Sequence, residues 1–528
     1  MAADNQTSGS NGSVKSYPEA WTKISQYLLP RNPEYNFWWQ LTGRHLAVLL
    51  DAAGYPIERQ YEALMFHYNW AIPYMGPAPG ANGVIPGKWK SLLQADGTPM
   101  EYSWKWNSSR AGDRPEIRYA MEPIGPYTGT GLDPLNQQAT RELLHRLDQA
   151  IPSMNLQWSN HFFAMLFDHD VAKLAAEGRA GADLSTSTGF GIDFGAAGPA
   201  IKTYFQGRKL GQTGFMPLED WVSAIKPLLT QDVAVAVAVA GSKNDSSCSS
   251  SNGGHGEGSL GALLHFIASH PEGAPLNPFS LAVDCVQPEK SRMKLYMNTP
   301  RTSFASVRDI MTLGGRITGE VVDSQLRALR ELIRAVLGLP EDFSDEAETE
   351  QTYFKESLSA ATASAPVVNG HTSTNGNGVD GKKKDSSPPT PPPHNPGFVY
   401  FFDVSDGRPL PEIKLNIPLR SYGHNDLRSA RGLVDWMQAR GRGAFGDRYL
   451  ETLERLAPGG GASSNGSSSV LEQTRGLQSF ISIVFSRSGE LGINSYLAVR
   501  GSDVFEKVPV SGGVRPTVGR RGTLRRDE

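Results

Sequence analysis

The pentapeptide Arg292-Met293-Lys294-Leu295-Tyr296 alternates charged or phenolic residues with apolar ones. In an extended strand successive side chains point to opposite faces, so Arg292, Lys294 and Tyr296 share one face. Related alternation occurs in Lys202-Thr203-Tyr204, Lys414-Leu415-Asn416 and Asn494-Ser495-Tyr496. A basic and aromatic face that recurs along a chain predicts a common centre toward which these strands point.

Helical and extended patterns follow each other in a repeated order. Residues 35–53 and 56–75 have the apolar spacing of helices, and residues 99–107 and 116–124 alternate like the strands of a hairpin. The same order is predicted in four further units. Their helices are predicted at 133–150, 155–178, 216–230, 258–270, 301–314, 322–338, 427–440 and 444–457. Their hairpins are predicted at 188–195 with 199–206, 279–287 with 291–298, 397–404 with 410–417, and 479–486 with 490–498.

Five units of two helices and a hairpin predict an α+β fold built on a closed, ten-stranded antiparallel β-barrel. Closure leaves no strand edge exposed, and helices outside the barrel can cover its apolar outer face. The inward positions are then free to be polar. A barrel of this strand number is wider than an eight-stranded barrel, which side chains can fill, so it should enclose a ligand chamber.

The repeated units predict one barrel domain over residues 17–500. A polar N-terminal segment, residues 1–16, precedes it, and a basic C-terminal tail, residues 501–528, follows it. Low apolar content predicts that the N-terminal segment is disordered, because it buries too little to offset its ordering entropy. The same reasoning predicts three disordered insertions, at about 241–257, 343–396 and 459–468.

Composition restricts the class of protein. The net charge of −3 at pH 7 gives no reason to expect a nucleic acid as partner. The two cysteines, Cys248 and Cys285, form neither a disulfide framework nor a zinc set, and this usage is typical of a reducing compartment. The N-terminal segment lacks the apolar core of a signal peptide, and no apolar run reaches the roughly 18 residues of a membrane span. These features predict a cytoplasmic protein.

Cationic residues recur on the second strand of four predicted hairpins. They are Arg118, Lys202, Arg292, Lys294 and Lys414. If these faces point inward, five cations meet in one chamber, and a dense anion such as a diphosphate, or water, must compensate them. The alternative is that they are solvated residues on outward strand faces, which is the usual place for such side chains. Their recurrence at equivalent positions favours the chamber.

Tyrosines stand beside the cations, and one carboxylate is a candidate for proton transfer. Tyr204, Tyr296 and Tyr496 could be ordinary packing residues of a sheet, or their rings could stabilise a carbocation and exclude water. Glu101 could accept a hydrogen bond from an aromatic acceptor and assist removal of its proton. Glu122, one strand further on, is the competing candidate.

The chain contains no Asp-Asp-x-x-Asp cluster of the kind that holds magnesium against a diphosphate, and no GxxxxGK[ST] loop. His161, His169 and their acidic neighbours Asp168 and Asp170 lack a spacing that would bring both histidines onto adjacent helical turns. The sequence therefore predicts neither a metal site nor a cofactor.

Several motifs together resemble the fungal aromatic prenyltransferases of the dimethylallyltryptophan synthase type. The resemblance extends over residues 35–500, and its best markers are 49–55 (LLDAAGY), 89–103 (WKSLLQADGTPMEYS) and 414–426 (KLNIPLRSYGHND). It implies a barrel of five ααββ repeats, the ABBA barrel. It also implies transfer of a prenyl group from a diphosphate to an indole or polycyclic phenol without a metal. The partners would be these two small molecules, although the chain could also form a homodimer.

The resemblance assigns roles residue by residue. Glu101 matches the glutamate that binds the N–H or hydroxyl of the acceptor. The diphosphate-binding set of the family is matched by Arg118, Lys202, Arg292, Lys294 and Lys414. The tyrosines that bind diphosphate oxygens and shield the allyl cation are matched by Tyr204, Tyr296 and Tyr496.

Two positions depart from the family pattern, because Asn416 and Gly492 replace tyrosines that are common there. Loss of two rings predicts a wider chamber, and hence a bulkier donor such as geranyl diphosphate or a polycyclic acceptor. Residues 275–290 also lack the arginine that members acting on amino acids tend to carry, which argues against free tryptophan. The alternative function is a non-catalytic barrel that binds isoprenoid diphosphates or aromatic compounds.

Overall fold

The computed structural model describes residues 17–80, 84–87, 89–94, 96–107, 113–181, 184–196, 198–229, 258–351, 397–458 and 469–499. The predicted N-terminal segment 1–16, the C-terminal tail 501–528 and the insertions 241–257 and 459–468 lie outside these residues. Residues 343–351, the beginning of the predicted insertion 343–396, are described. They contact the start of the helix at Phe304–Met311, where the Ala305 amide donates to the Asp345 carbonyl at 2.8 Å.

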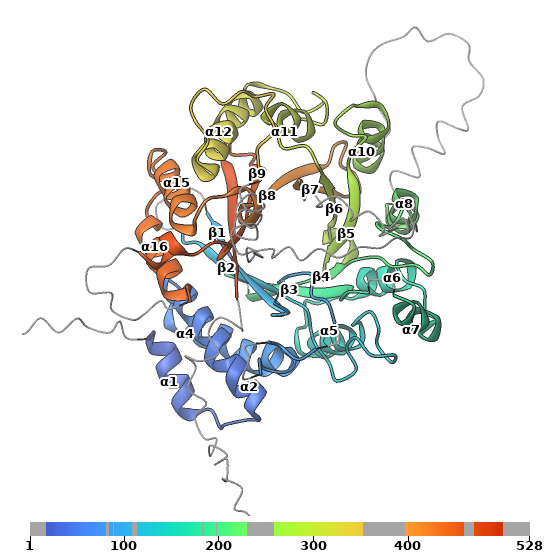
Figure 1. The fold of residues 1–528 in the computed structure, drawn as a ribbon, viewed down its shortest axis with the longest axis vertical. Coiled ribbons are helices and arrows are strands. Elements are labelled where there is room, and N and C mark those ends of the chain that lie inside the picture. Colours follow the sequence, from blue (N-terminus) through green and yellow to red (C-terminus); the bar gives the residue numbers. More distant parts are fainter. Residues whose placement is uncertain are drawn as a thin grey trace, which may run out of the picture.

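Ten strands form one closed barrel at the centre of the molecule (Figure 1). The strands are β1 (Met100–Trp106), β2 (Glu116–Met121), β3 (Thr188–Gly195), β4 (Gly198–Phe205), β5 (Asn277–Asp284), β6 (Met293–Thr299), β7 (Phe398–Val404), β8 (Glu412–Pro418), β9 (Gln478–Phe485) and β10 (Leu491–Ala498). Each strand pairs antiparallel with its sequence neighbours, and β1 closes the barrel against β10. This confirms the predicted antiparallel barrel and its strand order.

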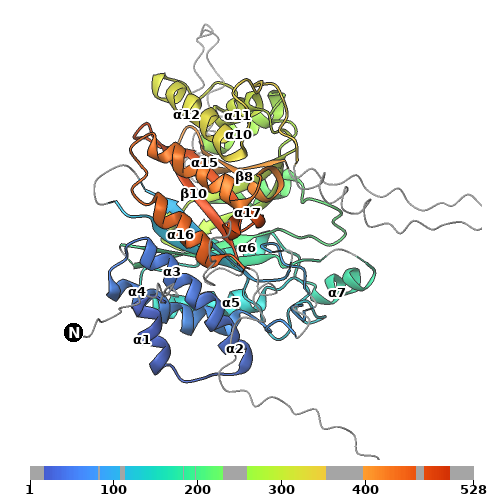
Figure 2. The same cartoon turned by 60° about the vertical axis from the view of Figure 1, so that its left-hand side comes forward.

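Helices surround the barrel (Figures 1 and 2). The α-helices are α1 (Glu19–Tyr27), α2 (Pro33–Trp38), α3 (Arg44–Ala52), α4 (Ile57–Phe66), α5 (Gln138–Ala150), α6 (Gln157–Met165), α7 (Val171–Arg179), α8 (Leu218–Ile225), α10 (Gly258–Ser269), α11 (Phe304–Met311), α12 (Glu320–Leu337), α14 (Leu419–Tyr422), α15 (Asp426–Gln438), α16 (Gly446–Leu456) and α17 (Val470–Gln473). Short helical turns are η1 (Trp39–Gly43), η2 (His67–Ala71), η3 (Ile72–Tyr74), η4 (Lys226–Leu228) and η5 (Pro288–Lys290).

Several predicted helices are divided in the structure; the helix predicted at 56–75, for example, is α4 followed by the turns η2 and η3. The helix predicted at 35–53 is α2, the π-helical turn η1 and α3 in succession. The helix predicted at 155–178 is divided into α6 and α7, because Phe167 forms a bridge with Arg208 and so leaves the helical path. The side chain of Asp170 then accepts a hydrogen bond from the Lys173 amide at 3.0 Å and caps the start of α7.

The strands present apolar residues outward and polar residues inward. On β6, Met293, Leu295 and Met297 have no exposed surface and belong to the core between barrel and helices. The alternate residues of β6, Lys294 and Tyr296, therefore face the barrel interior. Because one face of each strand is buried against helices, a slip of one residue would turn the charged set into the apolar layer, and the register is strongly specified.

Candidate active site

Charged residues of neighbouring strands pair with one another at one end of the barrel interior. Arg118 on β2 donates from Nη2 to Glu116 Oε1 at 2.8 Å, and its Nε lies 3.6 Å from Asp193 Oδ2 on β3. Lys202 on β4 also donates to Asp193. In the register of the barrel Arg118 is opposite Asp193, and Lys202 is opposite Asp284. Two of the predicted cations therefore share one carboxylate.

A second group of ion pairs is formed by β5, β6 and β7. Arg292, just before β6, donates from Nε to Asp284 Oδ2 at 2.8 Å, and its Nη1 lies 3.6 Å from Asp403 Oδ2. Lys294 Nζ donates to Asp284 Oδ1 at 2.8 Å. Asp284 is thus shared in the same way as Asp193. The side chain of Arg292 is 42% exposed, whereas that of Lys294 is 8% exposed, so Arg292 lies at the mouth of this end.

Burial and charge act in opposite directions on these groups. Burial alone would raise the pKa of Asp193, but Lys202 and Arg118 outweigh it and hold that pKa below its ordinary value. The pKa of Asp284 is lowered in the same way by Lys294 and Arg292 against the effect of burial. Burial lowers the pKa of Lys294 to about 8, with Arg292 and Lys202 adding to the effect and Asp284 opposing it.

Lys414 on β8 has a different environment. It is buried, and burial followed by the repulsion of Arg118 and Lys202 lowers its pKa well below the ordinary value. Its Nζ lies 5.5 Å from the centre of the Phe401 ring. With the Asn494 amide oriented so that its oxygen faces Lys414, that oxygen accepts a hydrogen bond from Nζ at 3.0 Å. Among the five predicted cations, Lys414 is therefore the one whose charged form a bound anion would stabilise most.

The predicted chamber of uncompensated cations needs a correction. Carboxylates that the sequence analysis did not single out already pair with the cations, namely Glu116, Asp193, Asp284 and Asp403. Their signal was present in the sequence, because Asp193, Asp284 and Asp403 follow the same alternation on the first strand of each hairpin. The cations are therefore held in position before any anion binds, and a diphosphate is not required to make their burial tolerable.

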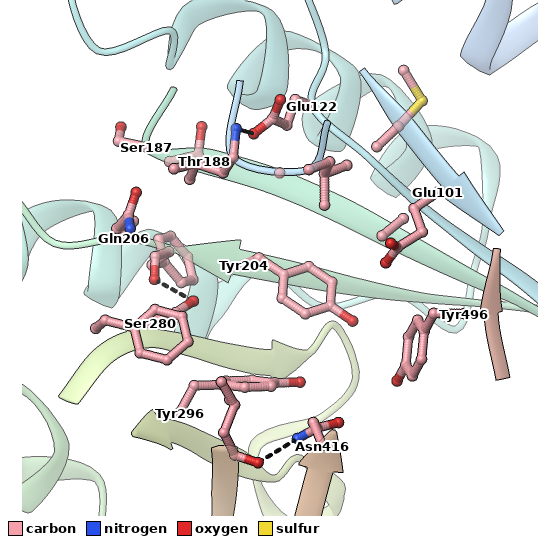
Figure 3. Close-up of a pocket in the computed structure, with 18 of the residues that line it drawn as sticks. Glu101, Glu122, Ser187, Thr188, Tyr204, Gln206, Ser280, Tyr296, Asn416 and Tyr496 are labelled. Carbon is pink, nitrogen blue, oxygen red and sulfur yellow. Dashed lines mark hydrogen bonds between the residues drawn. The ribbon is translucent and has the colours of Figure 1, made fainter. Parts of the chain in front are cut away.

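The five cations and the carboxylates paired with them are called the charged layer below. An aromatic cavity of about 310 Å³ also lies in the barrel interior (Figure 3). Tyr204, Tyr296 and Tyr496 line it; Tyr204 and Tyr296 are two residues along their strands from Lys202 and Lys294, and Tyr496 is two residues from Asn494. Their rings come from different sides of the barrel, with 6.5 Å between the centres of Tyr204 and Tyr296. Phe401 adds a further ring, 5.3 Å from that of Tyr296. The structure thus brings the three predicted tyrosines together.

Glu101 on β1 points into the same cavity (Figure 3). It is 8% exposed, and its Oε1 accepts a hydrogen bond from Ser479 Oγ at 2.5 Å. Burial raises its pKa, while the hydrogen bond from Ser479 and the charge of Arg420 act in the opposite direction. A buried carboxylate with a raised pKa and an open side toward a cavity is suited to accept a proton from a bound molecule.

Glu122, the competing candidate, has its carboxylate occupied by protein donors. Its Oε2 accepts from Ser91 Oγ at 2.6 Å, and its Oε1 accepts from the Leu92 amide at 2.8 Å and from Thr186 Oγ1 at 2.5 Å. These bonds hold the segment before β1 against the barrel. The geometry therefore favours Glu101 for chemistry and gives Glu122 a structural part.

The two positions linked to chamber size differ in location. Asn416 lines the aromatic cavity, and its Nδ2 donates to the Val399 carbonyl at 3.3 Å (Figure 3). Gly492 is not among the residues that line the cavity as the structure describes it. It is opposite Val484 on β9, and a Cβ added at Gly492 would stand 2.8 Å from Val484 Cγ1. The hypothesis of a wider acceptor cavity therefore rests on Asn416 and not on Gly492.

No group of three or more histidine, cysteine or acidic side chains within the described ranges has an arrangement that could hold a metal ion. No helix in the same ranges is both long and apolar enough to cross a membrane.

A closed barrel of ααββ units, with basic groups at one end and an aromatic cavity beside them, defines the barrel class of prenyltransferases. The family model described as tryptophan dimethylallyltransferase matches residues 34–452. The chain belongs to this family and is a prenyltransferase.

The relatives agree with this assignment. A prenyltransferase of Pestalotiopsis microspora is 43% identical over 517 residues, with 97% of each chain covered. Xanthone prenyltransferase B of Emericella nidulans is 39% identical over 479 residues, with 90% of each chain covered. The crystal structure of AnaPT from Neosartorya fischeri has a similar fold, with a TM-score of 0.63 at 22% identity, covering 92% of this chain and 98% of that one. The first two similarities show the family, and the third shows the fold.

Proposed function

We propose that this enzyme transfers a dimethylallyl or geranyl group from its diphosphate to a ring of a polycyclic phenol or an indole, without a metal ion. The observation that carries the proposal is the tyrosine-lined cavity, which Glu101 also lines and whose Tyr204 and Tyr296 are two residues from Lys202 and Lys294 of the charged layer. Relatives named as xanthone prenyltransferases, at 39% and 38% identity, favour the polycyclic phenol.

The charged layer would act on the donor. Arg118, Lys202, Arg292, Lys294 and Lys414 would bind the diphosphate oxygens, and an arginine offers a fork of donors where a lysine offers a mobile charge. As the allylic C–O bond breaks, negative charge grows on the leaving diphosphate. Fixed cations in a buried site stabilise that charge without reorganisation, which is the largest contribution that such a site can make.

The cavity would act on the cation and the acceptor. Rings of Tyr204, Tyr296 and Tyr496 would surround the allyl cation and keep water from capturing it. The aromatic ring of the acceptor then forms the new C–C bond, and loss of the proton from the attacked carbon restores its aromaticity. Glu101 would accept the hydrogen bond from the acceptor hydroxyl or N–H, which increases the electron density of the ring.

Replacement of Glu101 by Gln tests the acceptor end. The amide keeps the size of the side chain but does not take up a proton, so we expect kcat to fall by about 100-fold or more. The KM for the donor should change little, because Glu101 is not a member of the charged layer. Glu58→Gln, on an exposed turn of α4, is the matched control. Unchanged turnover of Glu101→Gln with a hydroxyxanthone would remove Glu101 from this role.

The length of the donor is tested at Asn416. A tyrosine at this position would extend into the cavity that Asn416 lines, so the Asn416→Tyr variant should lose activity with geranyl diphosphate and keep activity with dimethylallyl diphosphate. We expect a shift of about tenfold in the ratio of kcat/KM values, as expected for filling part of an apolar pocket. Competition between dimethylallyl and geranyl diphosphate measures this ratio. A wild-type preference for the shorter donor, left unaltered in the variant, would contradict the hypothesis.

Two broader predictions accompany this function. We expect the enzyme to work in the cytoplasm, and the chain could form a homodimer. Fractionation of cells that express the protein tests its location, and analytical ultracentrifugation of the purified protein determines its oligomeric state. A panel of indoles and hydroxyxanthones, incubated with each donor in the presence of a chelator, identifies the acceptor and tests metal independence together.

A further inference from the structure

A second cavity, of about 550 Å³, lies beside the aromatic cavity. The segment before β1 and one residue of α14, Arg420, form its walls, and Leu92 and Leu93 line both cavities. Glu122 binds the Leu92 amide and so holds this shared wall in place. A molecule in the aromatic cavity is therefore separated from the second cavity only by the side chains of this short segment.

Three residues that line the second cavity carry buried hydrogen-bond donors without partners among the described residues. The Nε and Nη2 atoms of Arg420, Nε1 of Trp89 and Nε2 of Gln94 are all buried and make no hydrogen bond in the described part of the chain. All of these atoms carry N–H groups. A buried donor without an acceptor is costly, and a buried charge more so. What these groups lack in common is a hydrogen-bond acceptor.

Arg420 also lies next to the proposed acceptor site. Its guanidinium carbon is 5.8 Å from the centre of the Phe480 ring, and Phe480 lines the aromatic cavity. Its charge also reaches Glu101, whose oxygen is bonded to Ser479. The guanidinium is therefore close enough to contact a substituent of the same molecule whose hydroxyl or N–H binds Glu101.

We propose that Arg420, together with Trp89 and Gln94, binds a carboxylate substituent of the aromatic acceptor, remote from the carbon that receives the prenyl group. The Nε and Nη2 atoms form one side of the guanidinium fork, and this side matches the two oxygens of a carboxylate. A neutral ester could accept hydrogen bonds but would add no charge opposite the guanidinium of Arg420. The inference rests on the proposed function, because it gives that acceptor a chemical feature.

The test compares a hydroxyxanthone carboxylic acid with its methyl ester as acceptors. For the wild-type enzyme we expect the KM of the acid to be lower by about tenfold or more, the range of a charge-assisted hydrogen bond. In Arg420→Met this preference should disappear, and in Arg420→Lys it should be partly retained. The KM for the donor should not change. Arg431→Met, which removes an exposed arginine of α15, is the matched control and should keep the preference.

Calorimetric titration of each enzyme with the acid and the ester gives a second readout that does not depend on turnover. Equal affinity of the wild-type enzyme for acid and ester, or an unchanged preference in Arg420→Met, would overturn the inference. If neither compound is prenylated but the acid binds more tightly in an Arg420-dependent manner, the carboxylate site stands and the proposed acceptor class fails. Circular dichroism and thermal unfolding of the variants confirm that they are folded.

Discussion

Lys294 and Lys414 are the basic residues of the charged layer whose pKa values burial lowers, Lys294 to about 8. A diphosphate beside them would favour their protonated forms, since an opposite charge within a few ångströms raises the pKa of an amine. Donor binding should therefore be coupled to proton uptake. Arginines at the same positions would remain charged at all relevant pH values.

The pH dependence of donor binding follows from this coupling. In the free enzyme Lys294 is charged below about pH 8 and loses its charge as the pH rises through that value. We expect the KM for the donor to rise above pH 8, by up to about tenfold per pH unit. In the Lys294→Arg variant the KM for the donor should rise less steeply with pH. Lys414 remains as a titrating group in both enzymes. Steady-state kinetics between pH 6.5 and 9.5 measures the KM for the donor in both enzymes. Identical pH profiles of this KM would refute the coupling.

At this scale the basic side chains were predictable and their partners were not recognised. Lys202 and Lys294 stood out because cations are rare on strand faces that also carry tyrosines. Asp193 and Asp284 follow the same period, but the barrel register that places Asp193 opposite Arg118 and Asp284 opposite Lys202 is a property of pairing between strands. Arg420 lies within a motif that was noted, yet only the folded chain shows that its nitrogen atoms lack partners.

Among the helices, the N-terminal group packs on the barrel through buried histidines. His45 on α3 and His67 at the start of η2 are buried, and burial lowers the pKa of each to about 3. His67 Nε2 lies 2.8 Å from Thr42 Oγ1 in the π-helical turn η1. The two π-helical turns thus meet through a pair of polar groups that have no contact with solvent.

These histidines predict acid sensitivity of the fold. Their pKa is near 6.5 in the unfolded chain and about 3 in the folded one, so the unfolded state binds more protons between these values. The stability that the two neutral histidines contribute to the folded state is fully present above pH 6.5 and is lost as the pH falls. We expect each histidine to reduce the free energy of unfolding by about 2 kcal/mol between pH 6.5 and 5. Urea unfolding at several pH values measures this.

A His67→Gln variant is the control for that experiment. Glutamine can still bond to Thr42 but does not titrate, so the pH dependence of its stability should be shallower by about one proton. Equal slopes for the two proteins between pH 6.5 and 5 would show that His67 is not the responsible group.

Strands were predicted more closely than helices for a physical reason. Each strand has one face toward helices and one toward a polar interior, which produces a clear period of two. The helices are more varied, because η1 and η2 insert an additional residue into a turn and α6 ends where Phe167 joins a bridge. Such local departures depend on packing between elements, and the spacing of apolar residues alone does not indicate them.

On the scale of the whole molecule, closure between β1 and β10 joins the first and last strands of the barrel. Trp106 Nε1 on β1 donates to Ser495 Oγ on β10 at 3.2 Å. The Trp104 and Trp106 rings contact Tyr449 of α16, with ring centres 5.4 and 4.9 Å apart. Closure was predictable because an open sheet would leave its two edge strands unpaired. This aromatic cluster, which covers the seam from outside, was not.

The carboxylates of the charged layer also bear on what happens after the reaction. Inorganic pyrophosphate, the second product, carries the same oxygens as the donor and would inhibit an enzyme whose cations had no other partners. Asp193 and Asp284 supply such partners from within the protein. If Lys202 and Lys294 bind the donor as proposed, these aspartates would still pair with them after pyrophosphate leaves, so its departure would not leave unpaired charges in the barrel. The internal ion pairs would then weaken the grip on pyrophosphate and limit product inhibition.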